Sequence, residues 1–104
     1  MEHTDFELIC CIVNAGFSQS VMEAAREAGA KGGTIVRARG SVNPKAAEFF
    51  NIQVQPDKEM IIILTPKTLR DDIMRAIYKG ADLAGNAQGI VFSLPVSCTT
   101  HVKM

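Results

Sequence analysis

The alternation of apolar and polar positions along the chain predicts four strands. Residues 6–13 form a nearly continuous apolar run, which is typical of a strand buried on both faces. Thr34–Arg39 alternates, so one face of a second strand carries Thr34, Val36 and Ala38. Residues 60–64 and 90–94 are short apolar runs bounded by turn residues, and we interpret both as strands.

A helix is predicted between the first two strands. Ser18 or Ser20 can cap its start, and Ser20 with Glu23 fits a capping box. Gly29 is suited to end it. The positions expected on its apolar face are Val21, Ala24, Ala25 and Ala28.

A second helix is predicted between the last two strands. Thr65 is a natural N-cap, and Pro66 falls at the favoured first helical position. The helix should run out at Lys79 and Gly80. The positions expected on its apolar face are Leu69, Ile73, Ala76 and Ile77.

The order of elements is therefore β-α-β, an irregular segment, and β-α-β. The halves, roughly 6–39 and 59–95, are similar in length and pattern. This order predicts an α+β, ferredoxin-like βαββαβ fold, in which a four-stranded antiparallel sheet carries two helices on one face. Residues 41–51 are expected to be irregular, 52–55 to form a short strand arm, and Pro56 with Asp57 to turn the chain. The uncovered sheet face would be apolar, which favours self-association.

Length and charge narrow the class of protein. A chain of 104 residues makes a single small domain, 1–104, with 47% hydrophobic residues. Eleven basic residues balance eleven acidic ones, which argues against nucleic acid as a partner. No apolar run, 60–64 included, is long enough to span a bilayer, and the acidic start of the chain is unlike a signal peptide, so we expect a cytoplasmic protein.

A loop of small residues, Gly85-Asn86-Ala87-Gln88-Gly89, lies between the second helix and the last strand. Backbone N–H groups in such a loop can approach an anion closely, because few side chains stand in the way. Most glycine-rich loops are only turns, so phosphate binding is one of two readings of this segment.

These segments, taken in order, resemble the P-II nitrogen-regulatory signalling proteins over nearly the full length. The motifs that carry the resemblance are EAAREAGAKGG leading into Thr34–Arg39 and Gly40, then Pro56, KEMIIIL, TPKTLRDDIMRAIYKGA, the glycine-rich loop and GIVFSLPV. The resemblance implies a cytosolic homotrimer that binds ATP or ADP, or an AMP-type nucleotide, between subunits. It also implies a T-loop at about 40–55 that docks on a transporter or metabolic enzyme, a phosphate-facing B-loop at about 80–89, and a C-terminal segment 96–104 that closes over a neighbour's nucleotide. Such proteins are regulators that often sense 2-oxoglutarate, and they are not enzymes.

The resemblance also implies site residues. The base of the nucleotide would lie near Thr34 and Gly40, and its phosphates near Gly85 and Gly89. His101 and Lys103 stand where the family has two phosphate-binding arginines. On this hypothesis Gly89→Asp should abolish nucleotide binding and leave the fold intact. Whether Mg²⁺ takes part stays open.

Two positions depart from the family. The B-loop lysine is Ile90 here, and an acidic residue of the third strand is Ile61. The family's T-loop glutamine and modified tyrosine have no evident match in SVNPKAAEFF. These departures fit a divergent member that binds ADP, AMP or another small anion, and equally one that has lost nucleotide binding.

Some residues allow two interpretations. Arg37 and Arg39 either face a phosphate beside Gly40 or protect an edge strand with surface charge. Cys98, His101 and Met104 are the candidate ligands of an alternative function, a trimeric metal-binding protein of the copper-tolerance type, which shares the fold. No catalytic pair of a nucleophile and a base is evident, so we do not expect an enzyme.

Overall fold

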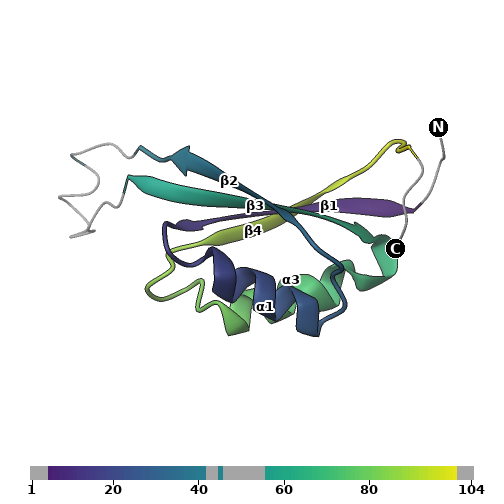
Figure 1. Cartoon of the computed structure of the whole chain (residues 1–104), viewed down its shortest axis with the longest axis horizontal. Helices are drawn as coiled ribbons and strands as arrows, with labels where there is room; N and C mark the ends of the chain where they lie inside the picture. The colour runs from purple at the N-terminus through teal and green to yellow at the C-terminus, as the bar shows by residue number, and fades with distance from the viewer. Residues whose placement is uncertain (1–4, 42–44, 46–55, 101–104) are drawn as a thin grey trace.

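The computed structural model describes residues 5–41, 45 and 56–100. Its four strands form one sheet in the order β2-β3-β1-β4, and every neighbouring pair is antiparallel. The helices α1 and α3 lie side by side on one face of this sheet (Figure 1). The predicted ferredoxin-like fold is therefore confirmed. The elements are β1 (Phe6–Asn14), α1 (Ser18–Glu27), β2 (Thr34–Arg39), β3 (Asp57–Pro66), the 3₁₀ turn η1 (Lys67–Leu69), α3 (Arg70–Gly80) and β4 (Ile90–Pro95).

The core lies between the sheet and the two helices. Alternate residues of β1 and β3 point toward the helices, and the apolar stripes of α1 and α3 meet them. The predicted apolar faces are confirmed at their central positions. Fully buried residues of this layer include Ile9, Cys11, Val13, Val21, Ala25, Ile61, Ile63, Ile73 and Ile77.

No helix of the described residues covers the opposite face of the sheet, as Figure 1 shows. The strand registers place twelve side chains in its central part, and all but one are apolar, while Phe6, Asn14, Lys58 and Pro66 lie at its ends. Several are more than a third exposed, including Ile90 at 58% and Leu94 at 49%. We call this surface the open face, and its members are Leu8, Cys10, Ile12, Thr34, Val36, Ala38, Met60, Ile62, Leu64, Ile90, Phe92 and Leu94.

Two predicted element ends are wrong. Thr65 and Pro66 belong to β3 and do not start a helix, because β1 pairs with β3 as far as Phe6 opposite Pro66. Asp57 likewise begins β3 and does not turn the chain, since it pairs with Arg39. In both places sheet pairing outweighs the local signal. The irregular segment 42–51, apart from residue 45, and the predicted arm 52–55 lie outside the described residues.

The capping box predicted for α1 is also wrong. The helix starts at Ser18, so Ser20 and Glu23 both lie inside it. The carboxylate of Glu59, from β3, lies at the start of the helix instead. It accepts hydrogen bonds from the Gly16 N–H at 2.8 Å and the Ser18 hydroxyl at 3.2 Å. A carboxylate here offsets the positive end of the helix dipole.

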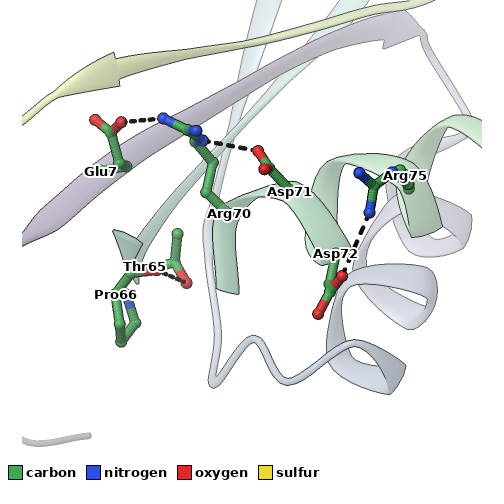
Figure 2. A network of polar contacts seen from close by, with 7 residues as sticks. All are labelled: Glu7, Thr65, Pro66, Arg70, Asp71, Asp72 and Arg75. Atoms are coloured by element: carbon green, nitrogen blue, oxygen red, sulfur yellow. Dashed lines mark hydrogen bonds and ion pairs between the residues drawn. The ribbon is translucent and has the colours of Figure 1, made fainter. Parts of the chain in front are cut away.

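A polar network ties the start of α3 to the sheet (Figure 2). Arg70 donates to Glu7 of β1 at 2.5 Å and to Asp71 at 3.0 Å. Glu7 is only 5% exposed, and within the described part of the chain its Oε2 atom has no hydrogen-bond partner. Hydrogen bonds to Asp71 and Glu7 raise the pKa of Arg70. The Arg75–Asp72 pair, at 3.6 Å, is exposed and contributes little.

The buried thiol of Cys11 makes stability depend on alkaline pH. Burial, with a smaller contribution from Cys10, raises the pKa of Cys11 from 9.0 to about 11. The unfolded chain therefore loses this proton at a lower pH than the folded chain. The stabilisation that this difference in pKa gives to the folded chain is fully present below pH 9. It is lost as the pH rises toward 11, and the free energy of unfolding then falls by up to roughly 2.7 kcal/mol.

We expect Cys11→Ala to reduce the fall in unfolding free energy between pH 9 and 11, even though the variant is less stable at pH 7. Urea unfolding at pH 7, 9 and 10.5 measures both effects. Equal pH slopes for the two proteins would contradict the assignment to Cys11.

Candidate functional site

Gly40 and Arg39 lie at one end of β2, where the chain leaves the sheet. The Gly40 N–H donates to the Pro56 carbonyl at 2.8 Å, which closes the base of the segment between them. A Cβ at Gly40 would approach the Lys58 side chain to 3.2 Å, so this is a close contact. Arg39 is exposed and stands opposite Asp57 in the register.

Thr34 occupies the other end of β2. It is exposed on the open face and pairs with Ile62. Six residue steps separate it from Gly40, which is about 20 Å along a strand. The two residues expected near a nucleotide base therefore do not lie together in one chain.

The segment 81–89 is a folded loop with its own anchors. Leu83 is 2% exposed and Ala87 is fully buried, and both pack into the core cluster. Five of the loop's N–H groups donate to carbonyls of the loop or of the end of α3. These are Ala81 to Ile77, Leu83 to Tyr78, Gly85 to Asp82, Gln88 to Gly85 and Gly89 to Leu83, at 2.9–3.4 Å. These five donors are already used within the chain.

Packing explains Gly89. A Cβ at Gly89 would come within 2.7 Å of Leu83 Cδ2 and 2.8 Å of Val13 Cγ1, both in the core. Gly89 is therefore required by the chain itself, whether or not an anion binds. A Cβ at Gly85 would overlap the carboxyl group of Asp82, whose Cγ lies 2.6 Å from that position, but this group ends an exposed side chain that can turn away.

Asn14 joins the 81–89 loop to the base of β2 and β3, which the sequence analysis did not foresee. Its backbone N–H donates to the Ala87 carbonyl at 2.9 Å, and its amide donates to the Asn86 carbonyl at 3.0 Å. The Lys58 ammonium donates to its Oδ1 at 2.5 Å. Asn14 is a polar residue at the end of a buried apolar strand, and this position is the signal in the sequence that could have pointed to its role. Because Asn14 is only 5% exposed, its polar groups need hydrogen-bond partners.

A cavity of about 520 Å³ lies at the same end of the sheet, between the β1–α1 connection and the ends of β2 and β3. Arg37 lines it, on the face that it shares with Arg39. The charges around it are mixed, so it offers no uniform anion site. Its charged and polar lining residues are Ser18, Gln19, Arg37, Asp57, Lys58 and Glu59.

Ile61 and Ile90, which stand where the resemblance leads us to expect an acidic residue and a lysine, occupy different environments. Ile61 is fully buried and faces the helices, where a charge would need a partner. Ile90 is 58% exposed on the open face, opposite Ile12. Neither side chain can contact a phosphate through a charge.

The C-terminal candidates fall largely outside the described residues. His101, Lys103 and Met104 are not described, and Cys98 is exposed. Within residues 5–41, 45 and 56–100, no group of three metal-binding side chains comes together. The same ranges contain no helix long and apolar enough to cross a bilayer.

Comparison with known proteins agrees with this fold. The PII protein of Arabidopsis thaliana, in a crystal structure bound to citrate, is 24% identical with a TM-score of 0.68, and the match covers 90% of this chain and 77% of that one. The PII-like protein CPII of Thiomonas intermedia K12, crystallised with ADP, AMP and acetate, is 16% identical with a TM-score of 0.73, covering 96% and 94%. A putative PII-like signalling protein of Thermus thermophilus is 17% identical with a TM-score of 0.68, covering 92% and 91%. No curated sequence matched.

The similar structures show the fold alone, and a family model shows the family. The model described as nitrogen regulatory protein P-II matches residues 6–104, which is almost the whole chain. The sheet order, the glycine-rich loop before β4 and the two helices on one face all lie inside this match. The chain belongs to the nitrogen regulatory protein P-II family.

Proposed function

We propose that this chain is a signalling regulator that assembles as a homotrimer and binds an adenine nucleotide between subunits. The observation that carries the proposal is the family match over residues 6–104. The crystal structure of the similar PII-like protein CPII with ADP and AMP supports the choice of ligand. In this proposal the protein acts in the cytoplasm and is not an enzyme.

The open face supports the assembly. Eleven of its twelve side chains are apolar, and it spans all four strands. Water contact with so large an apolar surface is unfavourable, and a second copy of the same face is the simplest cover. Three copies that pack these faces around an axis would bury Ile90, Phe92 and Leu94, which are exposed in one chain.

The placement of the site residues suggests how a nucleotide would lie. The base would sit near Thr34, and the phosphates would point toward the other end of β2, where Gly40 and Arg39 lie. The 81–89 loop is connected to that end through Asn14 and Lys58. His101 and Lys103, which the resemblance assigns to phosphate binding, would complete the site from an adjacent copy.

Regulation would follow from a shift between conformations of the 41–55 segment. The nucleotide must bind one conformation better than another, and the favoured conformation then binds or releases a target. The target class that the family suggests is a transporter or an enzyme of nitrogen or carbon metabolism.

Calorimetry tests the proposal. ATP, ADP, AMP and cyclic AMP are titrated into the purified protein, with and without Mg²⁺ and 2-oxoglutarate, and its mass is measured by light scattering. We expect saturable binding of at least one nucleotide at one site per chain, and a mass near three times 11.3 kDa. Failure of all four nucleotides to bind would contradict the nucleotide part of the proposal and leave the assembly to be judged by mass.

A further inference from the structure

Asp82 stands out in the loop that the proposal places next to phosphates. It has φ 53°, in the left-handed region, and its carboxyl group lies directly over Gly85. The carboxyl group fills the space that a Cβ at Gly85 would occupy, so it covers one approach to the loop backbone. An incoming anion would therefore meet a carboxylate where the glycine alone would leave an opening.

No ion pair neutralises the charge of Asp82 among the described residues. Between Gly80 and Ile90 it is the one ionisable side chain in the sequence. Among the described residues, its carboxylate accepts no hydrogen bond and forms no ion pair. The segment therefore carries a formal charge of −1, while five of its N–H groups are bonded within the chain.

These observations run against a loop built for polyphosphate. Two negative charges about 5 Å apart repel each other, and the repulsion corresponds to a loss of affinity of roughly 4-fold in water to 300-fold near a protein surface. Each further phosphate charge adds to this loss. A divalent cation between the groups would remove it.

We propose that Asp82 is a specificity determinant that makes this loop favour an adenine nucleoside monophosphate over the di- and triphosphate when no divalent cation is present. This inference rests on the proposed function, because it assumes that the phosphates point toward residues 85–89. It adds the ligand class that this particular loop selects. It also assigns a role to a residue outside the set predicted from the sequence.

The test compares Asp82→Asn with the matched variant Asp72→Asn. Asparagine tolerates the left-handed region as well as aspartate does, so the loop should keep its shape. Asp72 is exposed on α3, and its replacement changes the net charge by the same amount away from the loop. Dissociation constants for AMP, ADP and ATP are measured by calorimetry in EDTA, and thermal unfolding checks that all three proteins are folded.

For the wild type we expect the affinity order AMP, ADP, ATP, from tightest to weakest. Asp82→Asn should improve ATP binding by roughly tenfold or more and AMP binding by much less. Asp72→Asn should leave the ATP-to-AMP ratio within about twofold of the wild type. An unchanged ratio in Asp82→Asn, or an equal shift in both variants, would overturn the inference.

A different outcome separates this inference from the proposed function. If the wild type binds none of the three nucleotides, the proposed nucleotide site is contradicted. If ATP then binds to Asp82→Asn and not to the wild type, this result still supports the inference that Asp82 disfavours ATP. No binding to either protein would overturn the inference as well.

Discussion

Replacing Phe92 with glutamate is expected to convert the proposed trimer into single chains. Phe92 lies on the open face opposite Cys10, and 37% of it is exposed in one chain. The side chain is thus available to a neighbouring copy, and its loss should affect the fold of one chain little. In a trimer, the variant would bury three carboxylates in an apolar interface without partners, at several kcal/mol for each charge. Light scattering should give a mass near 11.3 kDa at concentrations where the wild type is a trimer.

Tyr78→Glu is the matched control for this prediction. Tyr78 is 55% exposed on α3, on the helix side of the sheet and away from the open face. The Tyr78→Glu substitution introduces the same charge in place of an aromatic ring, so this variant should keep the mass of the wild type. A Phe92→Glu protein that stays trimeric would show that the open face is not the interface. Loss of the trimer in both variants would point to net charge as the cause.

The periodicity of the sequence predicted the sheet well because burial and strand period agree in this chain. Thr34–Arg39 was predicted with its observed ends, and the apolar run at 6–13 became β1 with one further residue. The predictions failed where a local signal competed with pairing. Thr65 and Pro66 look like a helix start, yet β1 supplies partners up to Pro66, and a strand that is paired on one side gains more than a capped turn. That partner is about sixty residues away, so no local pattern reveals it.

The candidate site was predictable only in part, because several of its contacts join residues that are distant in the sequence. The glycines of the 81–89 loop were visible in the sequence, but their cause was not. Gly89 approaches Val13, which is distant in sequence, and Gly85 accommodates the Asp82 carboxyl group. The roles of Asn14 and Glu59 also depend on residues more than forty positions away, which single-sequence reasoning cannot pair. His101 and Lys103 stay predictions that rest on the family resemblance.

Gly89→Ala is expected to destabilise the fold by about 1–3 kcal/mol, because the added methyl group would overpack the core. Its Cβ would lie 2.7 Å from Leu83 and 2.8 Å from Val13, and the Ile12 carbonyl stands at 3.1 Å. Leu83 and Val13 are at most 2% exposed, so neither has open space into which to move. Urea unfolding of the variant and the wild type measures the difference. Gly89→Asp should cost more, since it also brings a carboxylate against apolar side chains.

Gly32 provides the control for this argument. A Cβ there would meet no atom within 4 Å, and its φ is not in the left-handed region, so Gly32→Ala and Gly32→Asp should each change stability by no more than about 0.5 kcal/mol. Equal stability of Gly89→Ala and Gly32→Ala would contradict the packing argument. If the argument holds, the expectation that Gly89→Asp removes nucleotide binding and keeps the fold is wrong. Loss of binding in that variant would report the damaged core, whereas Asp82→Asn changes the charge next to the phosphates and leaves the packing of Gly89 intact.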